Sequence, residues 1–363
     1  MRLAGIEVRD FRSLEQLQLN LEPGITSLVG VNAAGKTNLL EALYFALSGR
    51  SFRTRDRREL IRFGAPVARS ELQVEGEEGG HRLLASVSRA EGRRHLLDGK
   101  PATPEVIARR RPHVVVFAPD RLVLVKGPPA ERRAHLDRFV AARWPSRSRL
   151  RQQYGQVLAQ RNALLRRIAA GFSSRSELDA WDETLAAAAA PLAEARGEAS
   201  EQLAPRFASA ADRLGLGEVR LRYVSREGAD PTALREALAE RRESDLRRVR
   251  TSAGPHLDEL ELSLGERSLR RYGSQGEQRA GLLALLLAER ESLIDGGMAA
   301  PVMLLDDVMS ELDPARRELL ADRLEERGQA LISAADETAL PAVARQRLVR
   351  MPLGVDSSLR VAA

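Results

Sequence analysis

The sequence contains no cysteine. The chain therefore has no disulfide framework, no zinc–thiolate site and no thiol nucleophile. It also lacks an apolar run of membrane-spanning length, and its first residues, MRLAGIEVRDF, alternate like a strand and do not resemble a signal peptide. We expect a cytoplasmic protein with no membrane segment, and 363 residues are enough for one large or two medium domains.

Lysine and aromatic residues are scarce. Only Lys36, Lys100 and Lys126 are lysine among 57 basic residues, and aromatic residues make up 4%. The net charge is +6, but 51 acidic residues mean that basic charge must be clustered to bind a polyanion. Few aromatic residues accompany the arginine clusters, so stacking on single-stranded bases is not indicated. Each cluster is a candidate for nucleic-acid phosphate contact, with a solvated face as the alternative: Arg53-Arg55-Arg57-Arg58, Arg109-Arg110-Arg111 and Arg241-Arg242-Arg247-Arg248.

A phosphate-binding motif lies near the N-terminus. Gly30 to Thr37 reads GVNAAGKT, which matches GxxxxGK[ST], between an apolar run typical of a strand and a segment typical of a helix. A glycine loop leading into a helix directs backbone N–H groups at phosphate oxygens. Lys36 is expected to reach the β- and γ-phosphates and Thr37 to ligate Mg²⁺. Because nearly all basic residues of this chain are arginine, composition alone would predict arginine at position 36. The lysine there indicates that the loop requires a compact ammonium group.

An acidic pair follows a second apolar strand near the C-terminus. Val302 to Leu305 is uniformly apolar and ends in Asp306 and Asp307. We expect Asp306 to hold Mg²⁺, usually through water, and Asp307 to orient or deprotonate the attacking water. Ser310-Glu311-Leu312-Asp313 then matches the D-loop of ABC-type ATPases. A surface acidic turn is the alternative, but it does not explain the preceding strand.

A third motif lies between these two. Ser274-Gln275-Gly276-Glu277-Gln278 opens a predicted helix, with Ser274 as a plausible N-cap and Gly276 permitting close backbone approach. Alone it is an ordinary capped helix. Between the other two motifs it resembles the ABC signature sequence. Because the halves of the nucleotide site lie at opposite ends of the chain, the segment between them is predicted to be an insertion.

Further stretches carry a narrower resemblance over essentially the whole chain. The sequence resembles the RecF family of bacterial DNA recombination and repair ATPases, relatives of the SMC proteins. Transporter ATPases do not share the most specific of these stretches, GPPAERRAHLD and GPHLDEL. The stretches are DFRSL (Asp10 to Leu14), SFRTRDRRELIRFG (Ser51 to Gly64), GPPAERRAHLD (Gly127 to Asp137) and SAGPHLDEL (Ser252 to Leu260).

The resemblance implies an α/β fold, an ABC-type P-loop ATPase head with a mixed β-sheet and an inserted helical arm. It implies ATP and Mg²⁺ as cofactors, and a head-to-tail homodimer in which the signature contacts the γ-phosphate held by the other subunit. The implied partners are duplex, gapped or single-strand/double-strand junction DNA and RecR/RecO-type mediators. The implied location is the cytoplasm, in association with the nucleoid. The implied nucleotide contacts are Arg12, Gly30, Val31, Asn32, Ala33, Ala34, Gly35, Lys36, Thr37, Asn38, Ser274, Gln275, Gly276, Glu277 and Asp313, with Lys36 and Asp307 catalytic and Thr37 and Asp306 at the metal.

Three parts are expected along the chain. Residues 1–118 form the first part of the head, residues 119–248 a mainly helical arm, and residues 249–363 the rest of the head. Apolar residues at helical spacing predict two long helices in the arm, joined by a turn at Gly171 to Ser174. Pro191 and Pro205 are expected to kink or divide the second helix.

Three departures from the ABC pattern predict slow turnover. No glutamine occurs between Gln73 and Gln152, where a glutamine loop is expected, so Asp120 is a candidate for that task. Ser333-Ala334-Ala335 stands where the switch histidine is expected, after the strand Ala330 to Ile332. The base position holds Asp307 instead of a glutamate, which is one methylene longer.

A second class of function is an ATPase that energises a transporter or a nuclease. A transporter ATPase normally has the switch histidine and no helical arm. A fused nuclease needs a catalytic domain, and only about 50 residues follow Asp313. A GTPase would need an NKxD-type motif, which is missing. A binding-only protein is disfavoured because every phosphate and Mg²⁺ ligand position is filled. The sequence therefore favours a DNA-binding ATPase.

Overall fold

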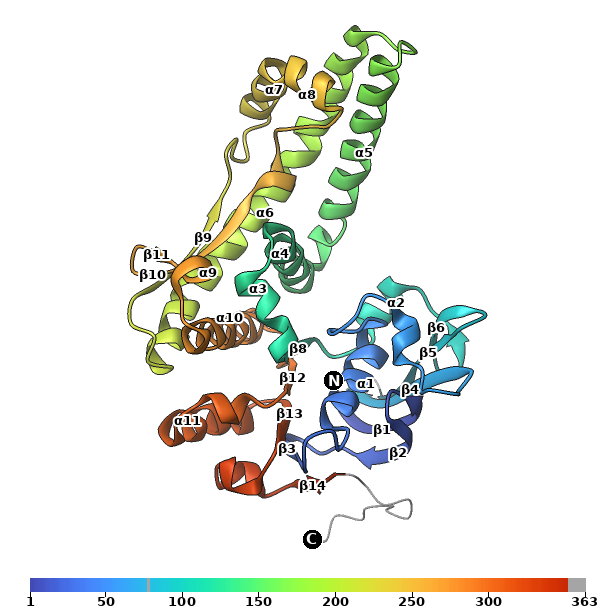
Figure 1. Cartoon of the computed structure of the whole chain (residues 1–363), viewed down its shortest axis with the longest axis vertical. Helices are drawn as coiled ribbons and strands as arrows, with labels where there is room; N and C mark the ends of the chain where they lie inside the picture. The colour runs from blue at the N-terminus through green and yellow to red at the C-terminus, as the bar shows by residue number, and fades with distance from the viewer. Residues whose placement is uncertain (77–78, 352–363) are drawn as a thin grey trace. The chain divides into compact units, whose positions relative to one another are not determined.

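The structure is a computed structural model that describes residues 1–76 and 79–351. Contacts divide the chain into two compact units (Figure 1). The first unit combines Met1–Arg121 with Leu293–Ala363, and the second is Leu122–Ser292. The last twelve residues of the predicted head, 352–363, lie outside the described residues. The N- and C-terminal parts of the chain thus form one body, with a contiguous segment inserted between them.

A parallel sheet forms the centre of the first unit. Its strands run in the order β14-β3-β13-β12-β8, and all of its neighbouring pairs are parallel. Every residue of β3, β12 and β13 is buried, as expected for strands of a parallel sheet that is covered on both faces. The strands are β3 (Gly24–Val29), β8 (Val114–Phe117), β12 (Val302–Leu305), β13 (Gln329–Ala334) and β14 (Leu348–Arg350).

A second, antiparallel sheet completes this unit, in the order β2-β1-β4-β5-β6-β7. Helix α1 (Lys36–Ser48) packs on β1, β4 and β5, so one core joins it to both sheets. Other helices are α2 (Pro104–Arg109) and α11 (Pro314–Glu326), with a 3-10 turn η1 at Arg57–Leu60. The strands are β1 (Arg2–Phe11), β2 (Leu14–Asn20), β4 (Val67–Gly76), β5 (Gly79–Ser88), β6 (Gly92–Leu97) and β7 (Lys100–Pro101).

The second unit is mainly helical. Its long hairpin joins α5 (Leu150–Ala169) to α6 (Leu178–Arg213), and apolar clusters connect these helices to α7 and α8. A small sheet in the order β11-β10-β9 packs on α6. The remaining elements are α3 (Val123–Lys126), α4 (Pro129–Arg143), β9 (Val219–Val224), α7 (Pro231–Glu240), α8 (Arg242–Arg248), β10 (Glu259–Leu264), β11 (Arg267–Ser268), α9 (Leu269–Tyr272) and α10 (Gln275–Asp295).

The α/β fold with a helical insertion is confirmed, but three details differ from expectation. Helix α6 is not divided: it continues through Pro191 and Pro205, because buried residues on both sides of each proline hold it against its neighbours. The segment predicted as helical also contains strand β9, which pairs with β10. The mixed sheet is resolved into separate parallel and antiparallel sheets.

Residues 249–292 belong to the second compact unit, together with the helical segment. Strand pairing accounts for this grouping, because β10 pairs with β9 and β9 packs on α6, the second helix of the hairpin. Over residues 1–76 and 79–351, no helix combines the length and hydropathy that crossing a membrane requires.

Candidate nucleotide site

The phosphate loop joins β3 to α1. Ala33 (φ 68°) and Gly35 (φ 96°) both adopt the left-handed conformation, which turns successive backbone N–H groups toward one side. Helix α1 begins without a side-chain cap and with no acidic residue in its first turn. Its first N–H groups therefore remain available, and the positive helix end favours an anion at this point.

Two residues fix the shape of this loop. A Cβ atom on Gly30 would lie 2.2 Å from the carbonyl oxygen of Met351, so only glycine fits there. Lys36 Nζ donates hydrogen bonds to the carbonyl oxygens of Gly30 and, at 3.0 Å, of Val31. Val31, Asn32 and Ala33 are exposed. The ammonium thus lies over the loop, at the position from which it can exchange these carbonyls for phosphate oxygens.

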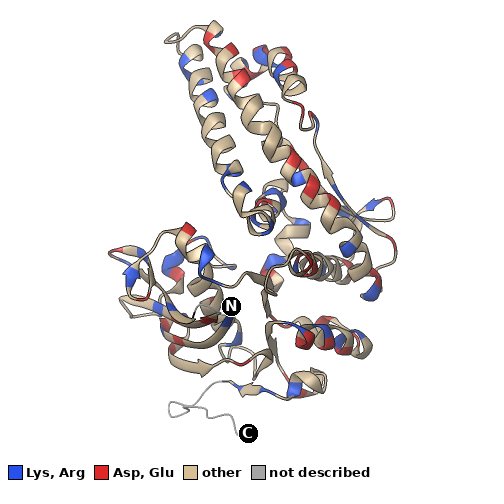
Figure 2. Ribbon diagram, turned by 180° about the vertical axis from the view of Figure 1, so that it is seen from behind, with Lys and Arg blue, Asp and Glu red and all other residues tan. Residues whose placement is uncertain are grey.

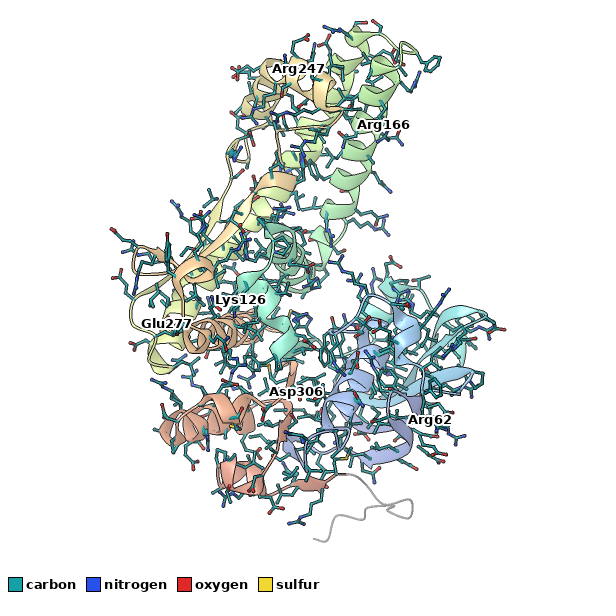
Figure 3. The ribbon with its side chains drawn as sticks, viewed as in Figure 1. Arg62, Lys126, Arg166, Arg247, Glu277 and Asp306 are labelled. Carbon is teal, nitrogen blue, oxygen red and sulfur yellow. The ribbon has the colours of Figure 1, made fainter. Side chains whose placement is uncertain are left out.

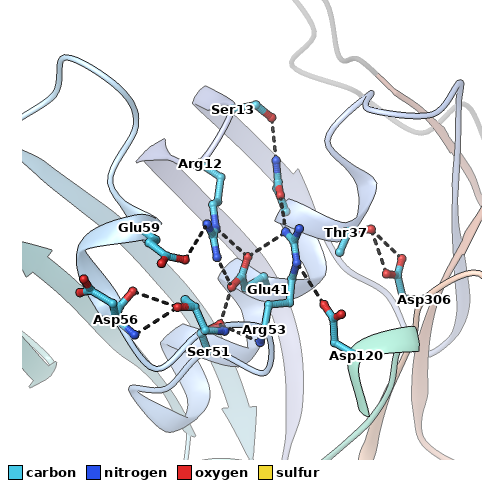
Figure 4. A network of polar contacts seen from close by, with 12 residues as sticks. Arg12, Ser13, Thr37, Glu41, Ser51, Arg53, Asp56, Glu59, Asp120 and Asp306 are labelled. Carbon is cyan, nitrogen blue, oxygen red and sulfur yellow. Dashed lines mark hydrogen bonds and ion pairs between the residues drawn. The ribbon is translucent and has the colours of Figure 1, made fainter. Parts of the chain in front are cut away.

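Thr37 and Asp306 meet although 269 residues separate them. Thr37 Oγ1 lies 2.9 Å from each carboxylate oxygen of Asp306 (Figure 4). The carboxyl ends of parallel strands share one edge of a sheet, which brings Asp306, after β12, beside the loop that follows β3. Burial raises the pKa of Asp306; bonds from Ser333 and Thr37 oppose this rise, and the charge of Asp307 adds to it.

These two side chains suit Mg²⁺. The ion takes hard oxygen ligands in an octahedron and in phosphate sites uses one or two protein groups, with water and phosphate completing the shell. Within the described residues, no group of three His, Cys, Asp or Glu side chains could hold a metal ion without such help. Thr37 and Asp306 therefore fit a Mg²⁺ site in which nucleotide phosphates and water supply the remaining ligands.

Ser333 connects the two acidic residues. Its hydroxyl donates to Asp306 Oδ1 at 2.6 Å and accepts from the backbone N–H of Asp307 at 2.9 Å. Asp307 is exposed and left-handed (φ 53°), while Asp306 is almost fully buried. Asparagine and aspartate tolerate this conformation better than other non-glycine residues. The exposed carboxylate is therefore held at the sheet edge, next to Asp306.

A buried carboxylate lies beside the loop, on the first helix. Glu41 is fully buried and accepts two 3.0 Å bonds from Arg12 and one of 3.3 Å from Arg53 (Figure 4). Arg53 also donates to Asn38 Oδ1 at 3.1 Å and lies 3.5 Å from Asp120. Arg12, Asn38 and Asp120, each predicted to act at the nucleotide, are thus joined through Arg53 and Glu41.

The signature segment belongs to the second unit. The backbone N–H of Ser274 donates to Glu277 at 2.6 Å, and the N–H of Glu277 donates to Ser274 Oγ at 3.2 Å. This reciprocal pair is a capping box at the start of α10, where Figure 3 labels Glu277, and it confirms Ser274 as the N-cap. The hydrogen bond from the Ser274 backbone lowers the pKa of Glu277. Ser274, Gln275 and Gly276 are exposed, and a Cβ on Gly276 would meet open space.

Asp313 begins another helix. Its side chain accepts from the backbone N–H of Arg316 at 3.0 Å and so caps α11. This contact gives Asp313 a structural task beside the nucleotide contact implied for it.

Sequence reasoning missed the parts played by Ser333, Arg53 and Glu41. Ser333 was noted only as the residue that replaces a histidine, and Arg53 only as a member of an arginine cluster. Glu41 gave a usable signal, because a carboxylate within the apolar stretch Leu39 to Leu43 must find a buried cation.

Comparison with known proteins agrees with this geometry. The family model described as "RecF/RecN/SMC N terminal domain" matches residues 2–355. The "DNA replication and repair protein RecF" of Anaeromyxobacter sp. (strain Fw109-5) is 39% identical over 370 residues, covering 99% of this chain and 96% of the relative. The protein of the same name from Myxococcus xanthus (strain DK1622) is 40% identical over 348 residues, covering 92% and 90%.

Solved structures are similar over nearly the same extent. One is described as the recombination mediator protein RecF-ATP in the RecFOR pathway, with a TM-score of 0.84, 27% identity and coverage of 94% of this chain and 93% of that one. Another, of RecF-ATPrS, has a TM-score of 0.81, 26% identity and coverage of 97% and 98%. An Smc head domain from Pyrococcus furiosus shares the fold, with a TM-score of 0.58, 18% identity and coverage of 96% and 93%. The family model covers nearly the whole chain and the relatives are about 40% identical over most of it, so the chain belongs to the RecF family.

Proposed function

We propose that the chain is an ATP-dependent DNA-binding protein of recombinational repair and replication-fork maintenance. In this proposal ATP drives a head-to-tail homodimer that binds duplex or gapped DNA, hydrolyses the nucleotide slowly and helps RecO/RecR-type partners load recombinase. The proposal draws on relatives that are called DNA replication and repair proteins and on a similar structure described as a recombination mediator with ATP in the RecFOR pathway.

The contact of Thr37 with Asp306 carries the nucleotide part of the proposal. This contact joins the two halves of a phosphate site. The N–H groups at the start of α1 have no side-chain cap and can therefore bind phosphate. Lys36 and the loop N–H groups would bind the phosphates, and Thr37 and Asp306 would hold Mg²⁺. The ion would supply charge neutralisation at the β- and γ-phosphates. Asp307 would accept the proton of the attacking water or orient it.

One feature of the signature segment supports a dimer. The chain has one phosphate loop and one signature segment, and Ser274, Gln275 and Gly276 are exposed at the start of α10. That helix end offers an anion a positive dipole and backbone donors. A two-fold dimer would let each signature segment complete the site of its partner. The division into head, arm and head at residues 118 and 248 remains part of this proposal.

The salt dependence of DNA binding tests the proposal. Duplex affinity is measured against salt concentration with and without ATP and Mg²⁺. Dimerisation would bring two DNA-binding surfaces together, so the logarithmic salt slope should steepen with ATP, each phosphate contact contributing about 0.9. Identical affinity and slope in both states would show that ATP does not control DNA binding.

A further inference from the structure

Four arginines from separate segments gather at the C-terminal end of α1. Helix α1 ends at Ser48 and is followed by its C-cap, Gly49, and by Arg50. Arg93 on β6 donates to the Gly49 carbonyl at 3.0 Å. The turn η1, which begins with Arg57, packs on β5, the neighbour of β6. Helix α2 packs on α1 and leads to Arg111. We call Arg50, Arg57, Arg93 and Arg111 the arginine cluster.

The charges of this cluster act on one another. Burial, and after it the charges of Arg57 and Arg50, lower the pKa of Arg93. Burial also lowers the pKa of Arg111, and the charge of Arg50 lowers it further. Among the described residues, no carboxylate forms an ion pair with any of the four. Positive charge therefore accumulates here without an acidic partner.

Several arginines outside this cluster are paired with acids. Lysine and arginine are distributed over both units (Figure 2). Arg53 pairs with Glu41 and Asp120 in the nucleotide site. In the second unit Arg241 bonds to Glu227 at 2.8 Å, and Arg242 bonds to Asp179 and Asp182 at 2.7 and 2.8 Å. Arg57 and Arg111 belong to two arginine clusters that are distant in the sequence. In the structure Arg57 acts on Arg93, and Arg50 acts on both Arg93 and Arg111.

Helix capping explains only part of the cluster. Arg93 and His95, on the same face of β6, bond to the carbonyls of Gly49 and Ala46 at the end of α1. The helix end has about half a negative charge, so one cation satisfies it. Arg93 also lies so close to Gly49 that a Cβ there would be 2.5 Å from its guanidinium. Arg50 and Arg57 are exposed and bring further positive charge that the fold does not require.

We propose that the arginine cluster is a docking site for the phosphodiester backbone of DNA. It lies at the end of a 13-residue helix opposite the phosphate loop, so roughly 20 Å of α1 separates bound DNA from bound nucleotide. Half-buried Arg93 and Arg111 fix the charge in place, and exposed Arg50 and Arg57 reach the phosphates. The nearby rings of Tyr44 and Phe52 pack edge to face against each other, with centroids 5.7 Å apart, so they offer bases no platform. Contact is to the backbone and is independent of sequence.

The inference rests on the proposed function and specifies its DNA surface. The test uses the full chain with ATP and Mg²⁺ and a duplex of about 25 base pairs, in three variants. They are Arg57→Ala, the double variant Arg50→Ala/Arg57→Ala, and the control Arg69→Ala. Arg69 is exposed on β4, on the opposite face of the antiparallel sheet from α1. Each substitution removes one exposed arginine charge.

The salt slope should fall by about 0.9 in Arg57→Ala and by about 1.8 in the double variant, with affinity reduced roughly tenfold or more in the latter. Arg69→Ala should match the wild type. ATP hydrolysis without DNA should stay unchanged, and thermal stability should not fall, because mutual repulsion is relieved. Wild-type slope and affinity in the double variant would overturn the DNA assignment and leave an acidic protein surface as the partner. A wild-type chain that binds no DNA would overturn the proposed function, and this inference with it.

Discussion

The hydroxyl of Ser333 bonds to both acidic residues of the nucleotide site, donating to Asp306 at 2.6 Å and accepting from the backbone of Asp307 at 2.9 Å. The side chain is fully buried on the strand next to β12. At this position the ABC pattern has the switch histidine. A short hydroxyl bonded to Asp306 and Asp307 sets their geometry.

Ser333→Ala should slow ATP hydrolysis without preventing ATP binding. Removing the hydroxyl takes a hydrogen bond from buried Asp306 and leaves the Asp307 N–H without its acceptor, so the reacting groups lose their alignment. We expect kcat to fall about tenfold, or about 1.4 kcal/mol, with little change in KM. Steady-state kinetics measure both. Ser310→Ala is the control, since its exposed hydroxyl bonds only to the Asp307 carbonyl. Equal losses in both variants would argue against a specific role for Ser333.

Lys36 and Asp307 should separate nucleotide binding from hydrolysis. Lys36→Ala removes a charge-assisted phosphate contact, so nucleotide affinity should fall at least tenfold. Asp307→Asn keeps the shape and tolerates the left-handed backbone, so ATP should bind but persist. Equilibrium nucleotide binding and single-turnover hydrolysis distinguish the two. Wild-type hydrolysis by Asp307→Asn would remove Asp307 as the base and make Asp120 the next candidate.

Ser274→Arg should abolish ATP-dependent dimerisation. The substitution puts a long cationic side chain at the exposed start of α10 and removes the hydroxyl that caps it. Sedimentation with ATP and Mg²⁺ should show wild-type association and a monomeric variant, while each monomer still binds ATP. Normal dimerisation of the variant would contradict the shared site.

Arg161 should be critical to the stability of the second unit. Its guanidinium is fully buried and bonds to Asp182 at 2.7 Å and to Asp245 and Thr251 at 2.8 Å. Arg161→Met would leave two buried carboxylates without this cation, so we expect unfolding free energy to fall by about 3–5 kcal/mol. Arg166→Met, on the exposed face of the same helix, should change it by less than about 0.5 kcal/mol. Chemical denaturation compares the pair, and equal effects would disprove the burial argument.

Mild acid should destabilise the protein through His256. Burial lowers the pKa of His256, whose ring nitrogens bond to the Tyr154 hydroxyl at 2.6 Å and the Thr251 carbonyl at 3.1 Å. The folded state thus binds fewer protons than the unfolded one, so this stability is present above about pH 6.5 and is lost as pH falls toward the folded pKa. The slope is at most about 1.4 kcal/mol per pH unit.

Thermal unfolding between pH 7.5 and pH 5.5 measures this loss. His256→Gln should reduce it, because the amide can donate and accept but does not titrate in this range. The part that remains would include His95, whose pKa burial also lowers. An unchanged pH dependence in His256→Gln would show that His256 does not titrate with folding.

Much of the fold could be predicted because its strong patterns are local. The strand at Val302–Leu305 has the predicted bounds, and the predicted turn at Gly171 to Ser174 lies just beyond α5, which ends at Ala169. Pro191 and Pro205 do not divide α6, because packing along a long helix outweighs two lost hydrogen bonds. The sequence could not reveal that Arg161 of α5 is buried and paired with acids from α6 and α8, because those helices are distant in the chain.

The candidate site was predictable in its motifs but not in its connections. Thr37 and Asp306 follow from their motifs, whereas Ser333 becomes visible only when β13 is found between β3 and β12. The structure also explains why position 307 has aspartate where the ABC pattern has glutamate. A left-handed backbone favours aspartate or asparagine over glutamate, so the shorter acid suits the sharp turn after β12.

The strand order of the parallel sheet bears on how the protein is made. Strands β3 and β8 are synthesised first, yet they are not neighbours: β12 and β13, from the end of the chain, lie between them. A ribosome will have released the contiguous segment Leu122–Ser292 before the strands that join β3 to β8 exist. That segment can fold during translation, whereas the central sheet must wait for the last part of the chain. Products that end before Val302 would contain the phosphate loop without the strands that hold it, so prematurely terminated chains cannot form a nucleotide site.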